Sequence, residues 1–455
     1  MSNKKGMRKD KAKVLLAFLA LFLFLGIFTL EADSAGTDDR YQTIFDAAYY
    51  AAQYPDVTAV YGTDARELYH HFVYQGIKEG RSPSAEFVLD YYKANYPDLS
   101  ELGHVNIYYY RHYVQQGKAE GREASKLLSN VAESTAQTPV PNPSGNIVQV
   151  VNALYSYEEM MDDIDLLVVT YPDRLSSGIL CNSYEGRPIP MLTLGNPNAP
   201  YKVLVQSSIH AREYMATQLT MKMVENICQT YDTADYRGIP YSRLFDRVCF
   251  TILPMMNPDG VSISQEGLDG AIFDETRTFM LTQSGGKRTK LTQIKANARG
   301  IDLNRNFPIG FKKKEEVTSP AIAFFGGDRA LSEPESMALA NLAANGGYSC
   351  FMSYHTMGNI IYYGSSAATP ASNEKSRTLA ALLNGLTGYK YYGPTTGYPN
   401  GSFADFATWQ TGKASVTLEL GNVNPVPIWQ FPELFEKNKK DFPAVAFAVL
   451  VGNIN

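Results

Sequence analysis

The stretch QSSIHAREYMATQ, residues 206–218, places a histidine, an arginine and a glutamate where an apolar run ends. The chain has six histidines in 455 residues, and only His210 and His355 fall after residue 147. Each histidine follows a strand-like run, YKVLVQSS before the first and YSCFMSY before the second. Ligand sites in open α/β sheets gather beyond the carboxyl ends of strands. The two histidines therefore predict a site at one edge of a sheet.

Residues 147–455 alternate strand-like runs with helical patterns, which predicts an α/β fold with a layered sheet. The composition, 45% hydrophobic and 19% charged, is typical of globular domains with real cores. Four runs are predicted strands: 201–208, 247–256, 348–355 and 414–421.

Two segments read as helices. Residues 215–231 place Met, Leu, Met and Ile four residues apart on one face. Residues 331–345 open with Ser332 and Glu335, which have the spacing of a capping box, and with a proline in the first turn.

The two histidines can be interpreted as ligands of a metal ion or as buried, hydrogen-bonded side chains. Glu213 lies one helical turn after His210, so both side chains can point to one place. Together with His355 they would form a three-ligand zinc site with a fourth position open. A histidine and a glutamate three residues apart are common in proteins, and a histidine at a strand end is often only buried and hydrogen-bonded.

Other residues strengthen the interpretation as a functional site. The run ANARGIDLNRNFP carries Asp302, Asn304 and Arg305, and arginine suits a bidentate grip on a carboxylate. Tyr398 lies in a loop rich in glycine and proline, of the kind that moves over a site. Glu419 lies inside an otherwise apolar strand, where a carboxylate is costly unless it is paired or takes part in chemistry.

The order of the motifs HARE, NPDG, GIDLNRNF, SEPE, SYHT and TLELG resembles the zinc carboxypeptidase family of the carboxypeptidase A type. The resemblance covers nearly all of residues 150–455. It is nearest to bacterial members that cut γ-D-glutamyl-diaminopimelate bonds in peptidoglycan peptides. It implies a mixed, twisted sheet sandwiched by helices and one catalytic Zn²⁺.

The resemblance also implies roles for the metal and its chemistry. His210, Glu213 and His355 would bind the zinc, and Glu419 would act as general base and then general acid. Asp302 would hold the ring of His210, a common support for a zinc histidine.

Substrate-binding roles follow from the same resemblance. Asn304 and Arg305 would hold the free carboxylate of the substrate, Arg212 would help to bind or polarise it, and Tyr398 would be the mobile loop tyrosine. The cation that holds the oxyanion lies elsewhere in the family, and here either Lys295 or Arg299 can fill that role.

The sequence departs from the digestive enzymes in two further places. Thr356 and Met357 follow His355 where those enzymes carry a tyrosine that shapes a substrate subsite. Phe403 and Asp405 fall near the expected specificity pocket, and the sequence leaves open which of them faces the substrate.

The N-terminus is typical of an exported protein. Its first 13 residues carry six Lys or Arg and one Asp, and the run Val14–Leu30 has no charge. Residues 1–36 are therefore a cleaved signal peptide or a retained membrane anchor, because seventeen apolar residues lie at the lower limit for a span. We expect an extracytoplasmic bacterial protein that is secreted, cell-wall-associated or membrane-anchored.

Residues 38–125 contain two tandem tyrosine-rich repeats of about 42 residues, 45–82 and 87–123. Each repeat reads as a helix, a Tyr-Pro-Asp turn and a second helix that ends at glycine. The repeats resemble modules of bacterial surface proteins, so we expect a small helical module that attaches the protein to the cell wall. His71 and His112 recur at matching positions and are expected to pack against aromatic rings and not to bind a metal.

Residues 126–146 are rich in Ser, Thr, Pro and Asn and form a predicted linker, so residues 147–455 form the predicted zinc peptidase domain. The net charge of −5 and the lack of a long basic block argue against a nucleic-acid partner. Four cysteines, none in a CxxC pair, leave disulfides open and exclude a cysteine zinc site.

The expected function is an exported zinc metallopeptidase that cuts an amide bond near a free carboxylate, in peptidoglycan stem peptides. The alternatives are a metallocarboxypeptidase acting on protein C-termini, a zinc amidohydrolase acting on small N-acyl amino acids, and a wall-binding protein without catalysis.

Overall fold

The computed structural model describes residues 39–77, 79–102, 106–118, 120–125, 146–151, 153–312, 317–394 and 399–454. The predicted signal peptide or anchor, nearly all of the predicted linker and Tyr398 lie outside these residues. Within the described residues, no helix combines the length and the hydropathy needed to cross a membrane.

The two repeats are helical, as predicted, and follow one plan. Each ends in a short π-helical segment, Phe72–Gly76 in the first and Tyr113–Gly117 in the second. The helices are α2 (Ala47–Gln53), α3 (Pro55–Tyr61), α4 (Ala65–His71), α5 (Leu89–Asn95) and α6 (Asn106–His112). The predicted Tyr-Pro-Asp turn is a helix junction, because the proline begins α3 in the first repeat and the 3-10 helix Pro97–Leu102 in the second.

Aromatic side chains form the core of the repeats, and both repeat histidines contact it. The hydroxyl of Tyr50 lies 3.1 Å from Nδ1 of His71, and that of Tyr92 lies 2.9 Å from Nδ1 of His112. Tyr50 and Tyr92 are fully buried. The histidines therefore act in packing, which agrees with the expectation.

The rest of the described chain is built on an eight-stranded sheet in the order β1-β2-β6-β3-β7-β10-β8-β9. The inner strands β6, β3, β7 and β10 run parallel, and the pairs β1–β2, β2–β6 and β10–β8 are antiparallel, so the predicted mixed sheet is confirmed. The strands are β1 (Leu175–Asn182), β2 (Pro188–Leu194), β3 (Tyr201–Ser207), β6 (Val248–Leu253), β7 (Cys350–Thr356), β8 (Ile360–Tyr363), β9 (Lys390–Tyr392) and β10 (Ala414–Leu420), with a separate pair β4 (Asp235–Tyr236) and β5 (Ile239–Pro240).

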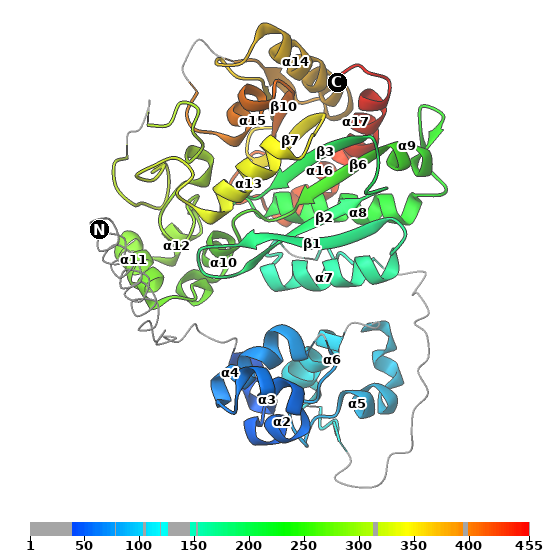
Figure 1. Cartoon of the computed structure of the whole chain (residues 1–455), viewed down its shortest axis with the longest axis vertical. Helices are drawn as coiled ribbons and strands as arrows, with labels where there is room; N and C mark the ends of the chain where they lie inside the picture. The colour runs from blue at the N-terminus through cyan, green and yellow to red at the C-terminus, as the bar shows by residue number, and fades with distance from the viewer. Residues whose placement is uncertain are drawn as a thin grey trace, which may run out of the picture. The chain divides into compact units, whose positions relative to one another are not determined.

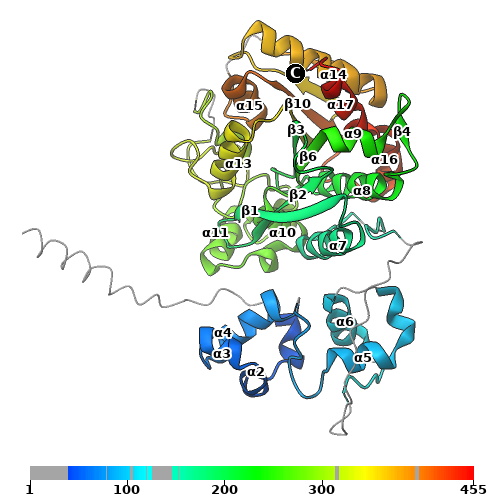
Figure 2. The same cartoon turned by 45° about the vertical axis from the view of Figure 1, so that its right-hand side comes forward.

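Helices cover both faces of the sheet, as Figures 1 and 2 show. The larger core cluster lies on the face that carries Cys350 and Met352 of β7, and a second cluster lies on the face of Phe351. Helices of the first face are α7 (Tyr157–Thr170), α8 (Met215–Thr230), α9 (Tyr241–Arg247), α14 (Pro370–Thr387), α16 (Phe431–Asn438) and α17 (Asp441–Leu450). Helices of the second face are α13 (Pro334–Asn345) and α15 (Phe403–Thr411), and a further cluster joins α10 (Pro258–Glu266), α11 (Asp274–Ser284) and α12 (Arg288–Leu291).

The predicted capping box of α13 is wrong. The N-cap residue is Glu333, and Ser332 accepts a hydrogen bond from the Asn306 side chain while its hydroxyl donates to Glu333. Glu335 accepts from the backbone N–H of Tyr184, 3.1 Å away. Ser332 and Glu335 therefore form hydrogen bonds with residues distant in sequence, and not the capping bonds that the local pattern predicted.

The repeat core predicts a sharp steric effect at Gly76. A methyl group there would overlap the hydroxyl of Tyr50, so Gly76→Ala must displace a fully buried ring. We expect a loss of about 1–3 kcal/mol of local stability. Hydrogen exchange of the full chain, read by mass spectrometry over residues 47–76, measures it. Val60→Ala, at an exposed position of α3, is the control, and equal protection in both variants would contradict the packing described here.

Candidate metal centre

The loop after β3 brings His210 and Glu213 together. Ser208 has a φ of 52°, a left-handed conformation that turns the chain away from the strand. Its hydroxyl donates to the carbonyl oxygen of Glu213, 3.0 Å away, and lies 2.7 Å from the hydroxyl of Thr217 in α8. The residues between β3 and α8 are thus held as one compact turn with both side chains buried.

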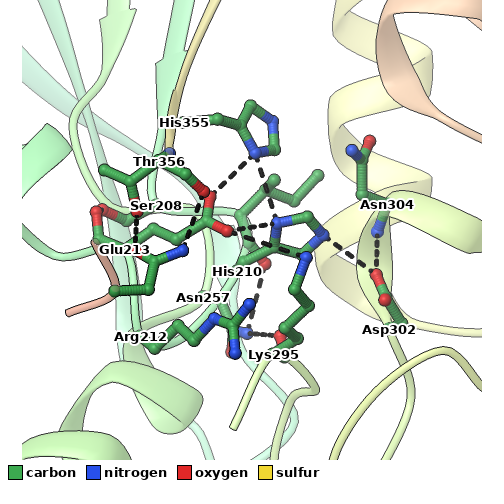
Figure 3. A network of polar contacts seen from close by, with 12 residues as sticks. Ser208, His210, Arg212, Glu213, Asn257, Lys295, Asp302, Asn304, His355 and Thr356 are labelled. Atoms are coloured by element: carbon green, nitrogen blue, oxygen red, sulfur yellow. Dashed lines mark hydrogen bonds and ion pairs between the residues drawn. The ribbon is translucent and has the colours of Figure 1, made fainter. Parts of the chain in front are cut away.

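The carboxylate of Glu213 lies between two imidazole rings (Figure 3). Its Oε1 is 2.9 Å from Nδ1 of His210, and its Oε2 is 2.9 Å from Nδ1 of His355. The two Nδ1 atoms are 3.2 Å apart. The backbone N–H of Thr356 also donates to Oε2, at 3.2 Å. Among the described residues, these three form the single cluster of His, Cys, Asp or Glu able to hold a metal ion, with ligand atoms within 4.8 Å of one another.

Asp302 fixes the orientation of the His210 ring from its other side. Its Oδ1 lies 3.2 Å from Nε2 of His210. Asp302 in turn accepts backbone N–H bonds from Asn304 at 3.1 Å and from Phe324 at 3.2 Å. A proton on Nε2 donates to this carboxylate, which leaves the lone pair of Nδ1 directed at the cluster.

Burial and charge act against each other on these groups. Burial alone would raise the pKa of Glu213, but the adjacent His210 and His355 hold it well below its ordinary value. Burial would lower the pKa of His210, but the carboxylates of Glu213 and Asp302 raise it to about 9. Burial would raise the pKa of Asp302, but His210 lowers it to about 2. These shifts favour ionised carboxylates beside a protonated His210, and a metal ion bound at Nδ1 would take the place of one of its protons.

The donor set fits zinc. Two imidazole nitrogens and one carboxylate are a ligand set of catalytic zinc sites, which keep a fourth position for water or substrate. The Asp302 contact supplies the support that a zinc histidine needs. The ligand atoms of the three side chains are buried and converge on one point. Buried polar and charged groups need a compensating partner, and a cation at that point would supply it.

Glu419 lies beside the cluster on the neighbouring strand. In the parallel pairing of β10 with β7, Glu419 is directly opposite His355, so both side chains lie on the same face of the sheet. It is partly exposed, unlike Leu418 and Leu420 on either side. Burial raises its pKa, and the Glu213 carboxylate adds to the rise while His355 opposes it. A carboxyl group with a raised pKa next to a metal centre is suited to accept and return a proton.

Of the two cations left open by the sequence, Lys295 is at the cluster. Its Nζ lies 4.0 Å from Oε1 of Glu213. Arg299 points elsewhere, because its guanidinium is 3.3 Å from Glu333 and lies over the ring of Tyr184. The structure therefore separates a lysine that faces the site from an arginine that stabilises a neighbouring loop.

Arg212 is held at the rim by Gln293. Its Nη1 lies 3.2 Å from the Gln293 side-chain oxygen, and its backbone N–H donates to Ile294. Its buried Nε has no hydrogen-bond partner among the described residues.

Asn304 and Arg305 lie in the 3-10 helix Leu303–Arg305, which Asp302 caps. The side-chain oxygen of Asn304 accepts from the N–H of Phe403, 2.9 Å away at the start of α15. Arg305 lies near the ring of Phe324, 6.0 Å from its centroid. These two residues are therefore joined to the cluster through Asp302, whereas Tyr398 lies outside the described residues.

The two residues near the expected specificity pocket have structural contacts. Phe403 is buried and packs against Phe307, and Asp405 forms the N-terminal cap of α15 with Ser402 through bonds of 2.8 and 3.2 Å. Both side chains are accounted for by packing and capping.

No role was predicted for Asn257, Phe324 or the backbone of Thr356. Asn257 is fully buried, and its amide donates to the carbonyl groups of Ile209 and Ala296, at 3.3 and 3.2 Å, which joins the loop of His210 to the segment of Lys295. The sequence carries one signal for a structural role of Asn257: an asparagine directly before a proline is typical of a helix N-cap, and Asn257 is the N-cap of α10. The other two contacts come from the backbone and carry no sequence signal.

Comparisons with known proteins agree with this geometry. Residues 160–440 match the sequence model of zinc carboxypeptidases, which is more than half of the chain. The chain belongs to the zinc carboxypeptidase family. It is thus a zinc metallopeptidase, as predicted, and zinc is the metal that this cluster fits.

The relatives and solved structures are distant. γ-D-glutamyl-L-diamino acid endopeptidase 1 of Lysinibacillus sphaericus is 26% identical over 287 residues, 62% of this chain and 70% of its own. Carboxypeptidase B of Homo sapiens is 29% identical over 322 residues, 68% and 71% of the two chains. The crystal structure of thrombin-activatable fibrinolysis inhibitor matches with a TM-score of 0.54 at 19% identity, over 65% of this chain and 74% of its own, and shows that the fold is shared.

Zinc binding at the cluster is expected to stabilise the protein. Free zinc at 100 times its Kd adds about 2.7 kcal/mol to the free energy of unfolding. We expect the Tm of the full chain to rise with zinc and to fall with a chelator, and the double variant His210→Ala, His355→Ala to lose this response. His112→Ala, in the repeats, should retain it. A zinc response that survives in the double variant would place the metal elsewhere.

Proposed function

We propose that the protein hydrolyses the amide bond between γ-D-glutamate and a diamino acid in peptidoglycan stem peptides, outside the cytoplasm. The observation that carries the catalytic part is the buried His210–Glu213–His355 cluster with Glu419 in register beside it. The relative from Lysinibacillus sphaericus, a γ-D-glutamyl-L-diamino acid endopeptidase, supports the substrate class. The apolar run Val14–Leu30 and the repeats support export and attachment to the cell wall.

The chemistry is that of an activated water. Zinc held by His210, Glu213 and His355 would lower the pKa of water to about 7 and polarise the carbonyl that is attacked. Glu419 accepts the proton of that water as the amide carbon is attacked, and then returns it to the leaving amine. Its raised pKa suits both steps, because the carboxyl group must take up and give back one proton.

The surrounding polar groups bind and orient the substrate. Arg305 and Asn304 hold the free carboxylate of the residue that is released, which sets the position of the scissile bond. Lys295 lies near Glu213 and stabilises the negative charge that develops on the carbonyl oxygen. Arg212 helps to bind or polarise the substrate from its place beside Gln293, and the role of Tyr398 stays a prediction because that residue lies outside the described part of the chain.

A second candidate is hydrolysis at protein C-termini, since carboxypeptidase B of several mammals is among the relatives. The two functions share the metal, Glu419 and the binding of the substrate's free carboxylate by Asn304 and Arg305. They differ in the substrate residue on the acyl side of the bond that is cut. Substrate comparison therefore separates them.

Turnover of a defined tripeptide tests the proposal. The zinc-loaded full chain is incubated with L-Ala-γ-D-Glu-meso-diaminopimelate, and products are followed by mass spectrometry. We expect wild type to release diaminopimelate, and Glu419→Gln to lose about 10³-fold or more in kcat while it retains zinc. Cleavage of ordinary C-terminal peptides alone would favour the second candidate. An active Glu419→Gln variant would remove Glu419 from the chemistry.

Lys295 and Arg299 give a matched pair of variants. Lys295→Ala should lower kcat by about 10²-fold, as the loss of one oxyanion-stabilising group does. Arg299→Ala should keep kcat within about threefold, because its partner is Glu333 and its effect falls on stability. Steady-state kinetics and the Tm of both variants show which of the two cations stabilises the negative charge on the carbonyl oxygen. Loss of kcat in Arg299→Ala with an intact Lys295→Ala would reverse the assignment.

A further inference from the structure

Phe324 combines exposure and backbone strain at the edge of the metal centre. The residue is 49% exposed, and its φ is 71°. A bulky residue other than glycine rarely adopts this left-handed conformation, which costs of the order of 1 kcal/mol or more and marks sites where strain serves function. Because about half of the residue's surface is exposed, burial does not account for a phenylalanine here.

The strained residue is built into the support of the site. The backbone N–H of Phe324 donates to Oδ2 of Asp302 at 3.2 Å, and the N–H of Asp302 donates to the carbonyl oxygen of Phe325 at 2.7 Å. The next ring, Phe325, is buried and anchors the segment. These backbone contacts do not involve the side chain of residue 324. The ring of Phe324 is therefore not needed to support Asp302, and its role is to be sought in the side chains that it contacts.

The ring contacts two cations that the proposed mechanism uses. Nζ of Lys295 is 5.6 Å from the ring centroid, and the guanidinium carbon of Arg305 is 6.0 Å from it. Both distances fall within the range of cation–π attraction. Lys295 is also attracted to Glu213, 4.0 Å away, and contact with an aromatic ring opposes its collapse onto that carboxylate.

We infer that Phe324 is a substrate-positioning residue that contacts both Lys295 and Arg305 and provides an apolar surface beside them. Resting on the proposed roles of these two cations, the inference concerns any substrate that places a carboxylate on Arg305 and a carbonyl oxygen near Lys295. The part of the substrate between those anchors, the released residue around its Cα, lies against the ring. The ring thereby positions the part of the substrate that joins its two polar ends.

The test compares Phe324→Gly with Phe324→Tyr in the full, zinc-loaded chain. Glycine keeps the N–H that supports Asp302 and relieves the strain, whereas tyrosine keeps the ring. Arg237→Gly removes a side chain at another exposed position with positive φ, 53° in the turn between β4 and β5, and is the matched control for strain relief. The substrate is whichever the wild type cleaves, the wall tripeptide or an ordinary C-terminal peptide, so failure of the substrate assignment leaves this test intact.

We expect Phe324→Gly to bind one zinc ion, to keep or raise its Tm by up to about 3 °C, and to raise KM about 10-fold. In a Glu419→Gln background, calorimetry should show a matching loss of substrate affinity. Phe324→Tyr and Arg237→Gly should keep KM within about twofold.

Two results would overturn the inference. An unchanged KM and affinity in Phe324→Gly would show that the ring is inert. A parallel loss of zinc, Tm and kcat in Phe324→Gly would show that residue 324 only maintains the fold.

Discussion

The carboxylate of Glu213, shared between two imidazoles, is the interaction on which the site depends. A charged carboxylate that is almost fully buried is stable only when its oxygens are compensated, and here His210, His355 and the N–H of Thr356 compensate them. Asp302 extends the same arrangement to the far side of His210. The result is a set of ligand atoms that converge within 4.8 Å of one another, which is what a catalytic zinc site requires.

The order of the central strands makes this convergence possible. Strands β3, β7 and β10 are parallel neighbours, so their carboxyl ends meet at one edge of the sheet. His210 follows the first strand, His355 lies near the end of the second, and Glu419 is opposite His355 on the third. Buried asparagines then tie the loops: Asn257 joins the loop of His210 to residues 295–296, and Asn306 binds Gly326 and Ser332. Hydrogen bonds thus connect the loops that carry the site to one another and to the ends of the strands.

Much of this could be predicted from the sequence, and the failures have physical causes. His210 and Glu213 carry a local pattern, and the motif order led to the mixed sheet. The choice between Lys295 and Arg299 depended on Glu333, a partner 34 residues further along the chain that no local pattern reveals. The capping box at Ser332 failed because Asn306 and Tyr184, distant in sequence, take its side chains. Phe324 was missed because a positive φ leaves no mark in the residue type.

Whether His210, Glu213 and His355 form the catalytic zinc centre can be seen in an anomalous difference map at the zinc edge, measured from crystals of the full chain. We expect one peak about 2.0–2.2 Å from Nδ1 of both histidines and from a carboxylate oxygen of Glu213. A peak at any other set of residues, or zinc-dependent activity without a peak at this cluster, would contradict it.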